Sequence, residues 1–127
     1  MLLFILGDDN MQFIEYPKCS TCQKAKKFLE SNEVNFEDRN IITETPSIDE
    51  LKLWQKKFDV PMKKLFNTSG LKYKKLNLKE KLLTMSEDEM FALLASDGML
   101  IKRPLVIDND FILIGFKEEE WNKLLKK

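Results

Sequence analysis

The sequence predicts an α/β domain in which helices flank a four-stranded mixed sheet. Three observations lead to this fold class. A strand, a helix and a second strand follow one another within about 30 residues near the start of the chain. A mostly helical stretch comes next, over residues near 47 to 95. The chain then closes with a predicted hairpin and one amphipathic helix, and this order of elements fits a mixed sheet with helices against it.

The first strand is predicted over Met11 to Tyr16, and it ends at Pro17 because proline cannot donate to the hydrogen-bond ladder of a sheet. A helix is predicted from Ser20 to near Ser31, since apolar residues recur there at three- and four-residue spacing. Val34 to Arg39 has the pattern of a second strand. A unit of this size is typical of a parallel strand pair with a right-handed crossover, which is the opening half of a thioredoxin-like fold.

The central stretch is predicted to be a helical insertion. Ser47 with Glu50 and Ser86 with Glu89 each form the sequence pattern of a capping box, which marks the start of a helix. The buried stripe of the second of these helices is predicted to consist of Met90, Leu93 and Leu94. Because no linker composition separates this stretch from its flanks, we assign it to the same domain.

The closing hairpin is predicted to pair Leu105 to Ile107 with Phe111 to Ile114 across an Asp-Asn-Asp turn. The last helix is expected to bury Trp121, Leu124 and Leu125. We therefore expect residues 11–127 to form one domain. Residues 1–10 are expected to be an N-terminal extension ahead of the natural start, because Met11 opens the pattern that the rest of the chain follows; an edge strand is the alternative.

The composition of the chain argues against some classes of binding partner. The 127 residues include 21 basic and 21 acidic side chains, so no global field draws the chain to nucleic acid or to an anionic membrane. The lysines between Lys72 and Lys81 are the densest basic stretch, and a solvated face is the simpler interpretation than a phosphate or acidic-protein contact. No apolar run approaches the roughly 20 residues that a membrane span needs. We expect no direct nucleic-acid partner and no membrane partner.

The chain has no histidine and two cysteines. The lack of histidine excludes Cys-His catalysis and the usual mixed zinc sites, so we expect neither a metal nor another cofactor. Two cysteines are too few for a secreted disulfide scaffold, and no secretory signal pattern is visible. A reducing compartment, the cytoplasm, is expected.

The two cysteines form a Cys19-Ser20-Thr21-Cys22 motif between the first strand and the first helix. At this place unpaired backbone N–H groups and the helix dipole favour a thiolate, so Cys19 is the predicted nucleophile. Cys22, one turn further on, is the predicted resolving thiol, close enough to close a disulfide. Lys18 adds a positive charge next to Cys19, which is expected to favour the thiolate further. Two reduced structural thiols, or half of an intermolecular zinc site, are the alternatives.

Arg103-Pro104 precedes the third predicted strand. In this fold a proline at that place is often cis and faces the active cysteine, where it shapes the groove that receives a partner. A trans proline that merely starts the strand is the alternative. Arg103 is a candidate to hold a thiolate or an anion by charge-assisted hydrogen bonds, and a plain surface arginine is the competing interpretation.

Five segments together resemble the Spx/ArsC family, the arsenate reductase-like branch of the thioredoxin superfamily. They begin at the cysteines and continue in the order of that family: YPKCSTCQKAKKFLE, SIDELK, KLFNTSGLKYKKLNLK, LLASDGMLIKRPLV and IGFKEEEW. The resemblance implies the thioredoxin-like fold from Met11 nearly to the C-terminus. It also implies a redox-active cysteine pair.

The resemblance leaves three functions open. Arsenate-reducing members carry a Gly-Thr-Ser-Arg sequence after the catalytic cysteine, whereas Cys22 and Gln23 stand at the last two of those positions here. Spx regulators keep a CxxC switch and bind the C-terminal domain of the RNA polymerase α subunit. We rank a thiol-disulfide oxidoreductase first, re-reduced by a glutathione- or thioredoxin-type thiol. A redox-sensing regulator comes second, and arsenate reduction third.

Overall fold

The computed structural model describes residues 11–125 of the chain. The predicted extension at residues 1–10 lies outside these residues. The described part of the chain divides into two compact units, one formed by residues 11–40 with 103–125 and the other by Ile41–Lys102. The second unit contains the predicted helical insertion and extends several residues past it at each end. That residues 11–127 form a single domain stays a prediction.

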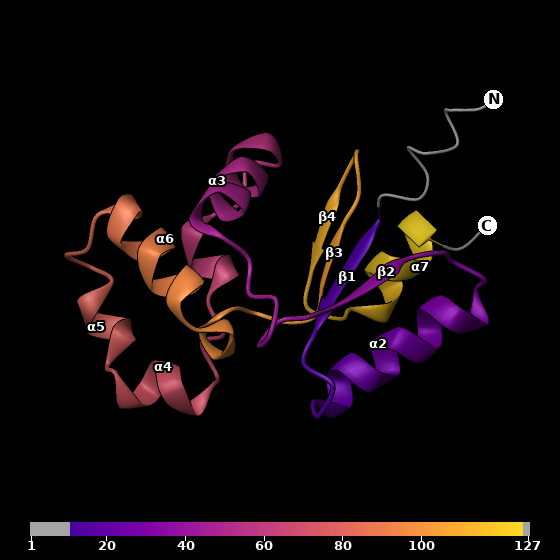
Figure 1. Cartoon of the computed structure of the whole chain (residues 1–127), viewed down its shortest axis with the longest axis horizontal. Coiled ribbons are helices and arrows are strands. Elements are labelled where there is room, and N and C mark those ends of the chain that lie inside the picture. Colours follow the sequence, from indigo (N-terminus) through magenta and orange to yellow (C-terminus); the bar gives the residue numbers. More distant parts are fainter. Residues whose placement is uncertain (1–10, 126–127) are drawn as a thin grey trace. The chain divides into compact units, whose positions relative to one another are not determined.

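The first unit is built on the predicted four-stranded sheet (Figure 1), whose strands are β1 (Gln12–Glu15), β2 (Glu37–Asn40), β3 (Leu105–Ile107) and β4 (Ile112–Ile114). Their order in the sheet is β2-β1-β3-β4. β1 pairs with β2 in parallel, while the β1–β3 and β3–β4 pairs are antiparallel. The sheet is therefore mixed, as the sequence predicts for a thioredoxin-like fold.

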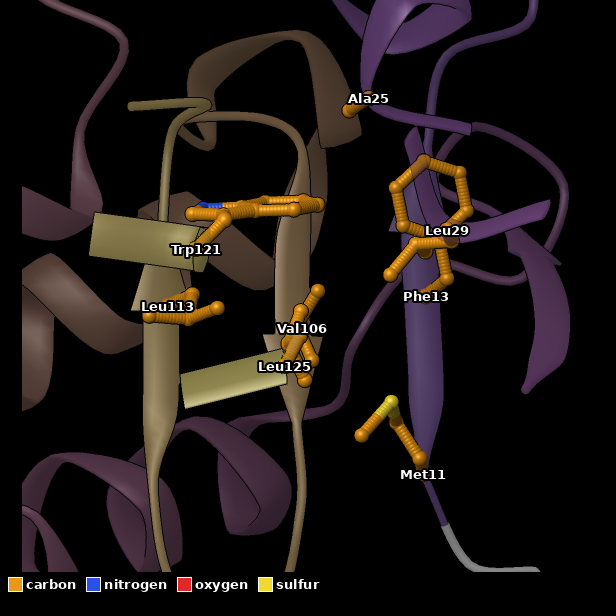
Figure 2. Packing of buried hydrophobic residues seen from close by; sticks show 8 residues of the cluster. All are labelled: Met11, Phe13, Ala25, Leu29, Val106, Leu113, Trp121 and Leu125. Carbon is orange, nitrogen blue, oxygen red and sulfur yellow. The ribbon is translucent and has the colours of Figure 1, made fainter. Parts of the chain in front are cut away.

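Two helices, α2 (Ser20–Ser31) and α7 (Glu118–Leu125), pack on one face of this sheet. Figure 2 shows the buried cluster between them and the strands: Met11, Phe13, Ala25, Leu29, Val106, Leu113, Trp121 and Leu125. The fully buried Trp121 indole meets the Phe13 and Phe116 rings edge-on, at centroid distances of 6.5 and 4.8 Å. Edge-to-face contacts add to the area that large rings bury, so this cluster holds α2 against β1.

The predicted second strand, Val34 to Arg39, is wrong at its start, because β2 begins only at Glu37. Glu33 has a left-handed backbone with φ of 56°, and the Val34 N–H donates back to the Leu29 carbonyl of the helix end at 3.0 Å. The chain is therefore still completing the turn at the end of α2 when it reaches Val34. The parallel ladder starts where the Glu37 N–H donates to the carbonyl of Met11 at 2.9 Å.

The second unit is helical. Its elements are α3 (Ile48–Lys57), the 3-10 turn η1 (Met62–Leu65), α4 (Leu71–Lys75), α5 (Leu78–Lys81), α6 (Glu87–Ser96) and the 3-10 turn η2 (Gly98–Leu100). Both predicted capping boxes are present. The Glu50 N–H donates to Ser47 Oγ and the Glu89 N–H donates to Ser86 Oγ, each at 3.1 Å. No helix in the described part of the chain is long and apolar enough to cross a bilayer.

Two predicted helix faces are partly wrong. In α6 the buried side chains are Phe91 and Leu94, whereas Met90 and Leu93 are only half-buried, because α6 turns the Phe91 side toward α3. In α7 Leu124 is exposed, and Trp121 and Leu125, four residues apart, form the buried stripe. Spacing alone therefore located both helices and part of each buried stripe, but it added Met90, Leu93 and Leu124 and left out Phe91.

Gly98 permits a close approach of two segments within the second unit. A Cβ atom at this position would lie 2.1 Å from the carbonyl oxygen of Ile41. That oxygen belongs to the backbone, so it cannot rotate away as a flexible side chain would. Glycine is required here because the Ile41 and Gly98 backbones touch.

We expect Gly98→Ala to destabilise the protein by about 2 kcal/mol or more, since an overpacked site forces the backbone to shift. The matched control is Gly70→Ala, whose Cβ would meet the movable side-chain amide of Asn67 at 2.6 Å. Urea unfolding followed by circular dichroism measures both variants. Equal losses of stability in the two variants would contradict this account of Gly98.

Candidate dithiol site

A tight turn delivers the first cysteine to the start of α2. β1 ends at Glu15, and the Cys19 N–H then donates to the Tyr16 carbonyl at 2.9 Å. Cys19 is the N-cap residue of α2, with an extended backbone, and the helix begins at Ser20. The Gln23 side-chain amide closes the turn by donating to the Pro17 carbonyl at 3.0 Å. The Cys19 side chain therefore sits among the unpaired N–H groups of the first helical turn.

The Cys19 thiol is half-exposed and its pKa is lowered. Burial raises this pKa, but the backbone N–H groups of Cys22 and Thr21 and the Cys22 thiol lower it by hydrogen bonding to the sulfur. The Arg103 side chain adds a further hydrogen bond that acts in the same direction. Hydrogen bonds to the charged form favour ionisation, so Cys19 is the more nucleophilic of the two thiols near neutral pH.

Cys22 lies in an environment that shifts its pKa in the opposite direction. Its side chain is fully buried, and burial raises its pKa to about 12, with a smaller upward contribution from Cys19. The Tyr16 backbone N–H opposes this rise by hydrogen bonding to the sulfur. The first turn of α2 directs Cys22 inward, toward the same face as Ala25 and Leu29.

Arg103 lies beside Cys19. In addition to its hydrogen bond to Cys19, its guanidinium stacks over the Tyr16 ring, with the Cζ atom 5.2 Å from the ring centroid. Arginine held on an aromatic face keeps its charge in a fixed place. The Arg103–Pro104 peptide bond is cis, and Pro104 is buried.

Lys18 is exposed, and the structure gives no contact that assigns it a role, so its influence on Cys19 stays a prediction. Both cysteines are free thiols in this structure. Among the described residues no group of three or more acidic or cysteine side chains could hold a metal ion.

Sequence reasoning missed a charged cluster formed by β1, α2 and β2. Glu15, the last residue of β1, is buried, and the Lys26 ammonium lies 3.8 Å from its carboxylate. Lys26 also pairs with Asp38 of β2 at 2.7 Å. The signal was available, since Met11, Phe13 and Glu15 alternate along β1 and an acidic residue at an inward position is unusual.

Fold and site together define a thioredoxin-fold protein with a pair of unlike thiols at the start of a helix. The model of the ArsC family matches residues 14–124, so the chain belongs to the ArsC family.

Relatives of this family resemble the chain over nearly its whole length. The Bacillus subtilis (strain 168) protein YusI is 52% identical over 114 residues, which cover 90% of this chain and 97% of YusI. The regulatory protein MgsR of the same organism is 31% identical and covers 94% of each chain. A crystal structure of an ArsC family related protein from Bacteroides fragilis superposes with a TM-score of 0.84 at 52% identity, over 91% of this chain and 98% of that one.

We expect Arg103→Gln to raise the Cys19 pKa, because the charge-assisted hydrogen bond to the thiolate is lost. The pH dependence of iodoacetamide alkylation at Cys19, followed by mass spectrometry, measures the shift. Lys24→Gln is the matched control, since it removes an exposed charge on α2 that solvent screens. An unchanged profile in Arg103→Gln, or equal shifts in both variants, would contradict this role of Arg103.

Proposed function

We propose that this ArsC family protein is a thiol-disulfide oxidoreductase in which Cys19 attacks a substrate disulfide and Cys22 releases the product. The observation that carries the proposal is the opposite shift of the two thiols. The half-exposed Cys19 has a lowered pKa, and the buried Cys22 has one raised to about 12. An attacking thiol needs thiolate character and access, whereas a resolving thiol must stay protonated and sheltered until a mixed disulfide has formed.

The proposed cycle moves two electrons. The Cys19 thiolate attacks one sulfur of a disulfide R–S–S–R′, forming a mixed disulfide with R and releasing R′ as a thiolate. Cys22 then attacks the Cys19 sulfur, so that the Cys19–Cys22 disulfide forms and the second thiolate leaves. The substrate is reduced to two thiols while the cysteine pair is oxidised. An external thiol of the glutathione or thioredoxin type restores the pair in the cytoplasm, without a metal or another cofactor.

A redox-sensing regulator is the second candidate. Its support is the similarity to the regulatory protein MgsR, over 94% of each chain. In this alternative the same Cys19–Cys22 disulfide forms without turnover and changes a surface that binds the C-terminal domain of the RNA polymerase α subunit. Direct binding to nucleic acid is not part of either proposal.

Arsenate reduction ranks third on the chemistry of the site. An oxyanion needs several fixed positive charges or N–H donors around it. Gln23, at the position where arsenate-reducing members carry arginine, is neutral and donates its amide to the Pro17 carbonyl. The guanidinium group that hydrogen-bonds to Cys19 is that of Arg103.

A glutathione redox series tests the proposed function. We expect the wild-type protein to lose both thiols together and reversibly, and then to catalyse reduction of a small disulfide with glutathione as the reductant. Cys19→Ser should abolish turnover, while Cys22→Ser should accumulate the mixed disulfide at Cys19, which mass spectrometry detects.

Reversible oxidation without turnover would favour the regulator, and binding to the α C-terminal domain in only one redox state would then support it. A wild-type protein that forms no Cys19–Cys22 disulfide would contradict both the oxidoreductase and the regulator.

A further inference from the structure

Tyr16 contacts each of the three groups that form the dithiol site. Its carbonyl oxygen accepts the Cys19 N–H at 2.9 Å, and its own N–H donates to the Cys22 sulfur. The Arg103 guanidinium lies over its ring, with the Cζ atom 5.2 Å from the ring centroid. Any residue other than proline could make the two backbone contacts. The side chain of Tyr16 therefore meets the site through Arg103.

The antiparallel pairing of β1 with β3 brings these two side chains together. In this ladder Ile14 lies opposite Leu105. The same register, continued by two residues past the paired positions, places Tyr16 opposite Arg103. Side chains that lie opposite each other in an antiparallel pair are direct neighbours, and long ones make contact there. The contact between the ring and the guanidinium is therefore built on the register of the sheet.

An arginine needs such a support to act at a fixed place. Its long side chain samples many rotamers, and every rotamer that points away from Cys19 takes the positive charge away from the sulfur. A guanidinium that is stacked on an aromatic face has already lost much of this freedom. Tyr16 and Arg103 are both half-buried, so solvent screens their contact less than it screens a contact on open surface.

The ring differs from the thiolate as a partner of Arg103, because it is present in every state of the cycle. The negative charge of Cys19 is lost when the sulfur enters a mixed disulfide or the Cys19–Cys22 disulfide. Arg103 then loses the anion to which it donates in the reduced protein. The attraction between a cation and the face of a ring does not depend on the state of the sulfur.

We propose that Tyr16 is a positioning residue, whose ring keeps the Arg103 guanidinium beside the Cys19 sulfur in both the reduced and the oxidised protein. This inference rests on the proposed dithiol cycle. During re-reduction an external thiolate attacks Cys19, and Cys22 leaves and takes up a proton. A second external thiolate then attacks the sulfur bound to Cys19, so that an external disulfide forms and Cys19 leaves as a thiolate. The guanidinium is already in place for that charge.

A guanidinium fixed in this way acts at two steps of the cycle. In the reduced protein it increases the fraction of Cys19 that is ionised and able to attack. In the last step of re-reduction it stabilises Cys19 as the leaving thiolate, and a thiol of lower pKa leaves faster. Removal of the ring should therefore slow both steps without changing their order.

The pH dependence of iodoacetamide alkylation at Cys19 tests the role of the ring. Tyr16→Leu removes the ring face and keeps apolar bulk, whereas the matched control Tyr16→Phe keeps the face and removes only the hydroxyl. We expect Tyr16→Leu to move the profile to higher pH and to lower the alkylation rate below neutral pH at least about twofold, the scale of a partly exposed cation–π contact. Tyr16→Phe should keep the wild-type profile. In an Arg103→Gln background, Tyr16→Leu should add little, because the ring acts through Arg103.

NMR of the wild-type chain tests the same contact in both redox states without a variant. We expect nuclear Overhauser effects between the Arg103 side chain and the Tyr16 ring in the reduced protein, and again after oxidation to the Cys19–Cys22 disulfide. Loss of these effects on oxidation would contradict the proposal, because the thiolate and not the ring would then hold the guanidinium.

The two proposals fail in different ways. A wild-type protein that forms no Cys19–Cys22 disulfide contradicts the dithiol cycle, whereas the alkylation profiles test Tyr16 in the reduced protein alone. If Tyr16→Leu keeps the wild-type profile, or if Tyr16→Phe shifts it equally, the role of the ring is wrong. Equal shifts by Tyr16→Leu in the wild-type and Arg103→Gln backgrounds would also overturn it, because a general distortion of the turn would then explain the change.

Discussion

The site depends on one constraint, the turn that stops β1 at Glu15 and starts α2 at Ser20. This turn gives Cys19 the N-cap position, where the first N–H groups of the helix have no partner within the helix. A cysteine sulfur at that position accepts hydrogen bonds from these N–H groups, and this lowers the pKa of its thiol. The same turn fixes the phase of α2, so that Cys22 points inward and is buried. One backbone feature thus produces two thiols of opposite character.

The rest of the first unit keeps this turn in place. The aromatic cluster around Trp121 holds α2 against β1, and the antiparallel pairing of β1 with β3 brings Arg103, which precedes β3, to the end of β1. There its guanidinium meets both Tyr16 and Cys19. The buried Glu15 cluster is the exception to apolar packing on this face.

Sequence reasoning worked where the signal is local and failed where it depends on packing. The cysteine motif, the capping boxes at Ser47 and Ser86, and the hairpin each lie within a few residues, so they could be predicted. The start of β2 could not, because it depends on the left-handed Glu33. The partners of Glu15 could not be predicted either, because Lys26 and Asp38 lie on α2 and β2, although an acidic residue at an inward position of β1 signals that a partner is needed.

The central claim is that the two thiols differ in acidity before any substrate is present. NMR titration of the reduced protein, with ¹³C at the cysteine Cβ atoms, measures this directly. The account predicts that Cys19 titrates below the ordinary value of a cysteine, while Cys22 stays protonated until near pH 12. Two thiols that titrate together near the ordinary value, or a Cys22 that ionises first, would contradict it.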